Sequence, residues 1–469
     1  MQASSYTALS YTWGEQKAVI PFLLTTKNME ARKQGVSLGD SVPLVYERAF
    51  EITRQLDVDF IWIDSLCMLQ DRDDNGSKDR KDNFDNHVHK IYQNARVTIC
   101  AIFQEPTMDP LQLRKVPGST EKAKVANNYY IAKRLGNPAV DIGVAGDQRG
   151  PYWAKRGWTF QERVLATSCI FLTDHQLYWE CRTALLEEDG MSHLPVTYKR
   201  KALRPQDFWP SMIRDYSGRT LSYDSDKIPA VTGIAKELSG EPNNGFLEFG
   251  FMPQRFGRDI LWESGGGLGA AALKRREVGG KVLSRPPSWS WAYWNGSIDF
   301  ETYLQDATLS SATYSVRDDV LQIRGAQYAE LQAGAKMATS LIAGPTDIVY
   351  SVRREREDRE KSLLTLKDKG TLDDVGWVSF DVNPNRSGGD ADEKKVVSVR
   401  VSTTTWTYPG KPDQVQKAAN VLILNALKSA PGVYRRVGVG QVWDVNLVDW
   451  KQATGPMPVG SFEEARPSL

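Results

Sequence analysis

Two carboxylates in the first 165 residues lie where acid–base or electrostatic chemistry can be done. Asp64 directly follows Val58–Ile63, a short and nearly all-apolar run that is typical of a strand covered on both faces. In an open parallel sheet the ligand crevice lies at the carboxyl ends of the strands, so a carboxylate there is placed to act on a substrate. The alternative is a structural cap, because an Asp after a strand often accepts backbone N–H bonds from the following turn.

The second carboxylate, Glu162, lies in a tryptophan-containing segment that is helical in composition, with Arg156 and Arg163 nearby. A buried Glu bonded to an Arg would form an ion pair that fixes the helix to the sheet. A catalytic carboxylate is the other interpretation, and the sequence alone does not show whether Glu162 and Asp64 meet.

The aromatic residues allow a binding role and a packing role. Trp13-Gly14 would suit a ligand-facing loop, since Trp supplies a stacking plane and Gly allows close backbone approach. The alternative is a turn whose Trp fills the core. Trp289 and Trp291 alternate, which predicts one face of a strand and favours a core position over a cofactor site.

Three other patterns resemble functional sites, but a structural role explains each of them better. Cys67 has no local protease signature and behaves as a small buried hydrophobe. Residues 71–82 imitate a calcium loop, but Asp82 replaces the usual Glu and Lys78 the usual apolar residue, so we expect a solvated loop. Glycines at 265 and 267 imitate a dinucleotide fingerprint, yet they follow a predicted helix rather than a strand.

The elements that must position the two carboxylates alternate between strand and helix. Strands are predicted at Tyr6–Thr12, Ile20–Leu24, Val58–Ile63 and Arg96–Phe103, and apolar residues at helical spacing predict helices over Val45–Leu56, with Ser41 as N-cap, and over Phe84–Ala95. This order predicts a parallel sheet with covering helices.

The remainder of the chain is mixed and then rich in strands. We expect a helix over Tyr152–Arg163, a hairpin from Cys169–Leu172 and Leu177–Cys181, and a long connection without clear periodicity over Asp109–Arg149. From Pro286 the pattern is β-rich, with polar interruptions at Arg353–Lys361 and Asn383–Lys395. The predicted organisation is therefore an α/β domain (1–165), a mixed α/β region (166–285) and a β-rich region (286–469).

Composition narrows the functional class. The chain has 469 residues, a formal net charge of +1, and four cysteines without a C-x-x-C pair. Nucleic-acid binding, a disulfide scaffold and a zinc ribbon are therefore not favoured. No apolar stretch approaches the roughly 20 residues needed to span a bilayer, and the start lacks a signal peptide, so we expect a cytoplasmic protein without a membrane span.

Several blocks carry a family resemblance. They are YTALSYTWG at 6–14, IWIDSLC at 61–67 with Gln70, and WTFQE at 158–162, and they resemble the fungal HET (heterokaryon incompatibility) domain. DKIPAVTGIA at 226–235, PSWSWA at 287–292 and YRRVG at 434–438 resemble the extended, full-length HET-6/TOL type. The family has a strand before the first block, so the closeness of Tyr6 to Met1 suggests a truncated start or a missing edge element.

The resemblance implies a role in nonself recognition leading to programmed cell death in filamentous fungi, through a TIR-like, flavodoxin-like domain that acts as a signalling module. Self-association or an incompatible-allele recognition protein would supply the partner. The alternative is a hydrolase that cleaves NAD, since some TIR domains do so. NAD is then a substrate, and no cofactor or metal is implied.

For the NAD-cleaving alternative, six residues are candidates. The candidate catalytic carboxylates are Asp64, Glu162 and Asp82, and Asp82 stands about where the family often has a Glu. Cleavage of an N-glycosidic bond needs such a carboxylate near an oxocarbenium-like transition state. The candidate ligand-binding residues are Trp13, Gly14 and Gln70.

Overall fold

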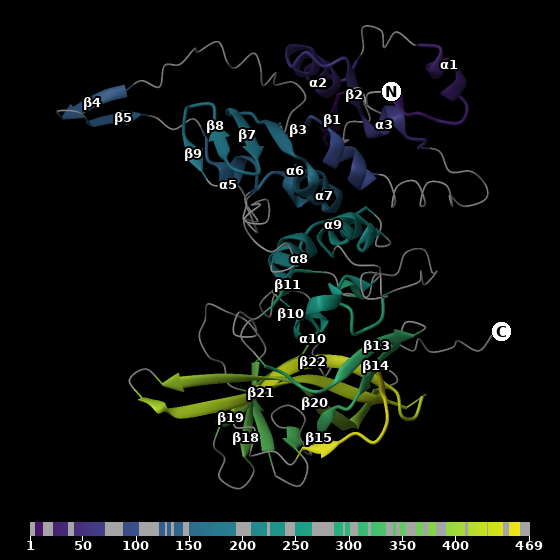
Figure 1. Cartoon of the computed structure of the whole chain (residues 1–469), viewed down its shortest axis with the longest axis vertical. Helices are drawn as coiled ribbons and strands as arrows, with labels where there is room; N and C mark the ends of the chain where they lie inside the picture. The colour runs from purple at the N-terminus through teal and green to yellow at the C-terminus, as the bar shows by residue number, and fades with distance from the viewer. Residues whose placement is uncertain are drawn as a thin grey trace. The chain divides into compact units, whose positions relative to one another are not determined.

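The structure is a computed structural model in which the chain divides into two compact units (Figure 1). Unit 1 comprises residues 1–208 and 219–238, and unit 2 comprises residues 209–218 and 239–469. The structure describes residues 5–12, 22–35, 42–70, 88–102, 122–126, 129–132, 136–143, 150–193, 208–222, 226–239, 249–264, 286–293, 296–300, 308–317, 320–333, 341–343, 348–352, 363–368, 374–380, 391–408, 411–428, 430–443 and 450–459.

The sheet of unit 1 has a parallel half and an antiparallel half. Its strands lie in the order β2-β1-β3-β6-β7-β8-β9. They span Phe60–Trp62 (β2), Tyr6–Ser10 (β1), Val97–Ala101 (β3), Ser168–Leu172 (β6), Leu177–Cys181 (β7), Leu185–Glu187 (β8) and Ser192–His193 (β9). The first four are parallel, and β6 to β9 are antiparallel. The predicted α/β sheet with flanking helices and the predicted β6–β7 hairpin are therefore confirmed.

Strand order creates a topological switch point between β1 and β3. The chain passes from β1 to β2 on one side and then returns past β1 to β3 on the other. Helix α2 (Leu44–Gln55) covers the sheet face that carries Leu9, whereas helical residues 88–94 cover the opposite face, which carries Ala8. Ligands of doubly wound sheets bind outside the carboxyl ends of the strands at such a reversal.

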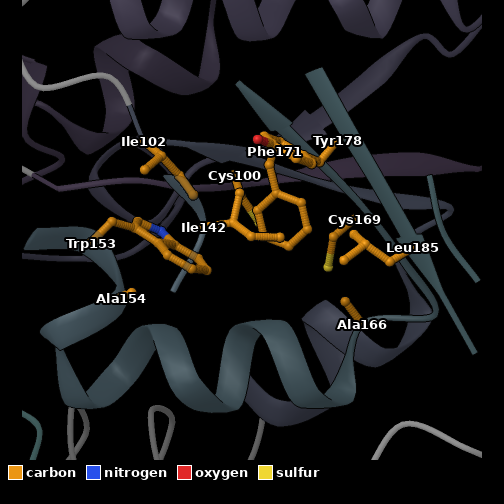
Figure 2. Close-up of a cluster of buried hydrophobic side chains, with 10 residues drawn as sticks. All are labelled: Cys100, Ile102, Ile142, Trp153, Ala154, Ala166, Cys169, Phe171, Tyr178 and Leu185. Carbon is orange, nitrogen blue, oxygen red and sulfur yellow. The ribbon is translucent and has the colours of Figure 1, made fainter. Parts of the chain in front are cut away.

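The face that carries Ala8 also holds a compact apolar cluster under helix α7 (Gly157–Leu165). Figure 2 shows its side chains, which are Cys100, Ile102, Ile142, Trp153, Ala154, Ala166, Cys169, Phe171, Tyr178 and Leu185. Because the side chains of this cluster come from β3, β6, β7 and helix α6 (Tyr152–Lys155), the cluster joins the two halves of the sheet to the helices.

Four local predictions for unit 1 are wrong. Strand β2 is an edge strand rather than a doubly covered one, and Phe60 is 56% exposed. Helix α2 begins after Pro43, not after a Ser41 cap. The described residues 22–24 are not a strand. The segment expected to be a connection without secondary structure, Asp109–Arg149, contains a hairpin of β4 (Lys122–Ala126) and β5 (Tyr129–Ala132), and helix α5 (Pro138–Asp141) follows it.

Helices α1 (Met29–Lys33), α3 (Asp64–Cys67) and α9 (Pro229–Ser239) complete the helices described in unit 1. None of the helices among the described residues of the chain has the length and apolar composition that crossing a membrane requires.

Unit 2 begins with short helices that surround buried tryptophans. They are α8 (Trp209–Ser217), η6 (Pro253–Arg255), α10 (Phe256–Asp259) and η7 (Trp291–Tyr293). The expected strand around Trp289 and Trp291 is wrong, because Trp289 lies in a turn and Trp291 begins η7. Both indoles are nonetheless fully buried core residues, and the indole N–H of Trp291 donates to the Gly250 carbonyl at 2.8 Å.

The remainder of unit 2 is rich in strands, as predicted. Eight antiparallel strands pair in the order β15-β16-β17-β18-β19-β22-β21-β20, and β20 pairs back with β15, so they form a closed ring. The strands span Gln327–Ala333 (β15), Leu341–Ala343 (β16), Ile348–Val352 (β17), Leu363–Asp368 (β18), Asp374–Phe380 (β19), Ala391–Tyr408 (β20), Lys411–Leu427 (β21) and Tyr434–Val442 (β22). Part of the polar interruption expected at Asn383–Lys395 is thus strand.

Shorter strands flank this ring. They are β10 (Glu263–Ser264), β11 (Ile298–Asp299), β12 (Thr308–Leu309), β13 (Thr313–Arg317), β14 (Val320–Arg324), β23 (Lys451–Gln452) and β24 (Met457–Val459). Arg436 of β22 fixes the ring to the helical part of unit 2, because its guanidinium donates to the carbonyls of Ile260 and Trp262 and lies 3.5 Å from the centroid of the Trp262 ring.

Gly250 is expected to be irreplaceable in unit 2. Its φ is +83°, and a Cβ atom built there would lie 2.7 Å from three atoms of the Trp291 ring. Gly250→Ala should therefore destabilise unit 2 by about 2–4 kcal/mol, through overpacking added to backbone strain. Gly432→Ala is the matched control, since its φ is +86° with no atom within 4 Å of the new Cβ. It should cost only about 1 kcal/mol in urea unfolding, and equal losses in both variants would refute the packing argument.

Candidate active site

The candidate site lies at the carboxyl edge of the parallel strands. Strand β1 ends at Ser10, strand β2 leads through Ile63 to Asp64, and helix α7 carries Glu162. Ser10 pairs with Cys100 near the end of β3, which places it at the switch point between these strands. Sequence segments far apart in the chain thus bring a hydroxyl and two carboxylates to one edge of the sheet.

Glu162 is held by a buried serine. The Ser10 hydroxyl donates a hydrogen bond to Oε2 of Glu162, and the Trp153 indole N–H donates to the Ser10 oxygen at 2.9 Å. Ser10 and Trp153 are both buried, whereas Glu162 is partly exposed. Glu162 therefore lies at the boundary between the apolar cluster and the edge of the sheet.

Burial raises the pKa of Glu162 from its ordinary value of 4.5 to about 7. The hydrogen bond from Ser10 and the charge of Arg156 act in the opposite direction, because both stabilise the ionised carboxylate. The charge of Asp64 raises the pKa further by repulsion. A carboxyl group with a pKa near 7 can take up and release a proton at physiological pH, as a general acid or base must.

Asp64 is the first residue of helix α3, whose N-cap is Ile63. Its Oδ1 accepts the backbone N–H of the adjacent Ser65 at 2.7 Å. The Ser65 hydroxyl lies in a buried cluster with two tyrosines, 2.9 Å from the Tyr11 hydroxyl and 2.6 Å from the Tyr46 hydroxyl. The turn that carries Asp64 is therefore tied to β1 and α2.

Tyr92 lies near both carboxylates, Glu162 and Asp64. Its hydroxyl donates to the Leu9 carbonyl of β1 at 3.2 Å. Its pKa is raised well above the ordinary value, first by burial and then by the negative charges of Glu162 and Asp64. A single side chain thus lies within electrostatic reach of both carboxylates.

The ion pair that fixes helix to sheet is made by Arg163, not by Glu162. Arg163 forms a bidentate pair with Glu180 of β7, at 2.9 and 3.0 Å. The Nη1 group of Arg163 donates to the carbonyls of Ile142 and Gly143. Because neighbouring residues of a helix point about 100° apart, Arg163 faces β7 while Glu162 faces β1.

The local contacts of Gln70 and Cys67 indicate structural roles for both residues. The Gln70 amide donates to the carbonyls of Asp64 and Met68, at 3.0 and 3.2 Å, and so closes the end of α3. Cys67 is exposed, so the expectation of a buried cysteine is wrong. Desolvation by neighbouring atoms nevertheless raises the pKa of its thiol, which is the opposite of what an activated nucleophile needs.

Several predicted residues lie outside the described part of the chain. They are Trp13, Gly14, Asp82, the calcium-like pattern at 71–82 and the glycine pattern at 265–270.

Sequence reasoning missed Ser10, Trp153 and Tyr92. One signal was available for Ser10, since it is the last residue of the strand and lies on the same face as Ala8, two residues earlier. The contact between Ser10 and Trp153 spans 143 positions, and no local pattern encodes it.

Comparison with known families decides what this domain is. Residues 6–162 match the family described as heterokaryon incompatibility protein (HET). Residues 6–162 form a HET domain. The match begins at the first residue of β1 and ends at Glu162, so the HET domain includes Ser10, Asp64 and Trp153. No curated protein and no solved structure matches the chain. This match supports a role in heterokaryon incompatibility.

The Glu162→Gln variant of the HET domain should gain stability only at neutral and higher pH. In the wild type, the folded state keeps a proton on Glu162 between about pH 4.5 and 7, whereas the unfolded state has lost it, so stability falls as pH rises through this window. Gln removes that penalty. We expect a gain on the order of 3 kcal/mol above pH 7 that disappears below about pH 4.5, measured by urea unfolding. An equal gain at pH 4 and pH 8 would contradict the burial of this carboxyl group.

Proposed function

We propose that this chain is a nonself-recognition protein and that its HET domain triggers programmed cell death when incompatible cells fuse. The proposal rests on the family match over residues 6–162 and on the likeness to TIR domains that the sequence motifs imply. The blocks at 226–235, 287–292 and 434–438 extend the proposal to the full-length HET-6/TOL type. Recognition would involve self-association or a recognition protein of an incompatible allele, in the cytoplasm.

The HET domain would act either as a signalling module or as an enzyme. A module needs only a surface for its partner, whereas an enzyme needs a site with perturbed titratable groups. One observation favours the enzyme: Glu162, with its pKa near 7, lies at the switch point within electrostatic reach of Asp64. Carboxylates engaged in separate ion pairs would have favoured the module, and the buried ion pair of α7 belongs to Arg163 instead.

The proposed reaction is hydrolysis of the N-glycosidic bond of NAD. The bond between the nicotinamide nitrogen and C1′ of the ribose breaks, and its electron pair stays on nicotinamide, which leaves as a neutral molecule. The ribose becomes oxocarbenium-like, and the negative charge of Asp64 would stabilise it. Water adds to C1′ and gives up a proton, which Glu162 would accept as general base. The products are nicotinamide, ADP-ribose and a proton.

Expression of the full chain in a filamentous fungus tests both parts of this proposal. The wild type should cause growth arrest and death, preceded by a fall in cellular NAD. Glu162→Gln, expressed at the same level, should do neither. Death with undiminished NAD would exclude the hydrolase and leave the signalling module, whereas survival of cells that express the folded wild type would contradict the death-inducing role.

A further inference from the structure

A chain of two hydrogen bonds leads from the apolar cluster of unit 1 to the candidate catalytic carboxyl group. The Trp153 indole N–H donates to Oγ of Ser10, and the Ser10 hydroxyl donates to Oε2 of Glu162. Trp153 and Ser10 are only 2% and 1% exposed, so neither group exchanges these bonds for water. These two hydrogen bonds therefore connect the packing of the core with the orientation of Oε2 of Glu162.

The chemistry of the indole fixes the direction of the first bond, and Glu162 accepts the second. An indole N–H is only a donor, so Ser10 must accept from Trp153. A serine hydroxyl has one proton and two lone pairs, and one of these lone pairs accepts from Trp153. The proton of Ser10 goes to Oε2 of Glu162, which accepts it.

Packing holds the first donor in place. The Trp153 ring meets the Phe171 ring edge to face, with centroids 5.9 Å apart and an interplanar angle of 84°. Figure 2 shows the indole extending into the cluster, which also contains Ile142 and Cys100. Because closely packed side chains occupy one rotamer, the indole N–H remains directed at Ser10.

We propose that Trp153 and Ser10 are positioning residues that keep Oε2 of Glu162 as a permanent hydrogen-bond acceptor, so that Oε1 alone takes up and releases the proton. For its catalytic meaning this inference rests on the proposed function: Oε1 would be the atom that receives the proton of the attacking water. The arrangement also orients the carboxyl group before any substrate binds, which spares the reorganisation that a free carboxylate would need.

Two substitutions each remove the donor of a different one of these hydrogen bonds. Trp153→Phe keeps an aromatic ring in the cluster but removes the N–H donor that polarises the Ser10 hydroxyl. Ser10 then donates a weaker hydrogen bond to the ionised carboxylate, which raises the pKa of Glu162. Ser10→Ala removes the bond to the ionised form altogether and also raises this pKa. We expect upward shifts of roughly 0.5–1 pH unit for Trp153→Phe and about 1 pH unit or more for Ser10→Ala.

Carbon-13 NMR of the full chain, labelled at the glutamate carboxyl carbons, measures this titration without any substrate. The resonance that is missing in Glu162→Gln identifies Glu162. Trp158→Phe is the matched control: it removes another indole N–H bond of unit 1, the one to Asp226 at 3.0 Å, which is not connected to Ser10. The control should leave the midpoint of Glu162 within about 0.2 pH unit of the wild type.

The outcomes separate the inference from the proposed reaction. A shift in Trp153→Phe and Ser10→Ala but not in Trp158→Phe supports the positioning role, even if the chain releases no nicotinamide from NAD. An unchanged midpoint in folded Trp153→Phe, or an equal shift in Trp158→Phe, overturns it. If Trp153→Phe does not fold, Ser10→Ala decides the question, and an unchanged or lowered midpoint there overturns the inference equally.

Discussion

Nicotinamide release from NAD should fall by about 10²–10⁴-fold when Glu162 is replaced by Gln, the usual contribution of a positioned general base. Gln keeps the shape of the side chain and can still accept the hydrogen bond of Ser10, but it cannot take a proton from water. The measurement is the steady-state rate for the purified full chain at pH 8. Retention of more than about a tenth of the wild-type rate would exclude Glu162 as the base.

Asp64→Asn supplies an independent check on the same site. It removes a negative charge that raises the pKa of Glu162, so the pH midpoint of the reaction should move downward while the rate falls. Glu51→Gln is a suitable control, since Glu51 is a half-exposed carboxylate of helix α2 that pairs with Arg48. It should change neither the rate nor the midpoint, and a change as large as that of Asp64→Asn would point to a general charge effect.

Removing one member of the Arg163–Glu180 pair should destabilise unit 1 by about 3–5 kcal/mol, the largest loss that we expect from a single substitution. Both side chains are 1% exposed or less, and Arg163 also lies over the Phe171 ring, 5.0 Å from its centroid. Arg163→Leu leaves the Glu180 carboxylate buried without its counter-charge, and Glu180→Leu does the same to the guanidinium. Hydrogen exchange of β6 and β7 peptides in urea measures the loss.

The double variant distinguishes a lost pair from lost packing. Arg163→Leu combined with Glu180→Leu removes both charges, so its loss should be smaller than the sum of the two single losses. The exposed pair of Lys33 and Glu30 is the control, and its disruption should cost less than about 1 kcal/mol. Additive losses in the Arg163–Glu180 double variant would contradict the account of the ion pair.

Local periodicity predicted the elements of unit 1 that surround the site. Apolar spacing in Val45–Leu56 placed helix α2, and the alternation of strands with helices predicted the parallel half of the sheet. Asp64 could be placed at the end of a strand because a short apolar run precedes it. The exposure of Phe60 could not be predicted, since an edge strand and a central strand have the same apolar composition when neither neighbour is known.

The partners of the site residues depend on contacts between distant segments. Whether Glu162 or Arg163 pairs with a charged residue depends on which one faces β7, and that follows from how the helix is rotated on the sheet. The burial of Trp289 and Trp291 was predicted correctly while their conformation was not, because residues 287–292 are all buried and alternation of tryptophans does not mark one buried face here. Long-range packing, rather than local propensity, decides these cases.

The pH dependence of nicotinamide release by the purified full chain tests the central claim most directly. If Glu162 is a partly buried general base, the rate should rise with pH through a midpoint near 7 and then level off, because only the ionised carboxylate accepts a proton. Release of no nicotinamide from pH 5 to 9 by the folded chain, or a rate with no midpoint near 7, would contradict it.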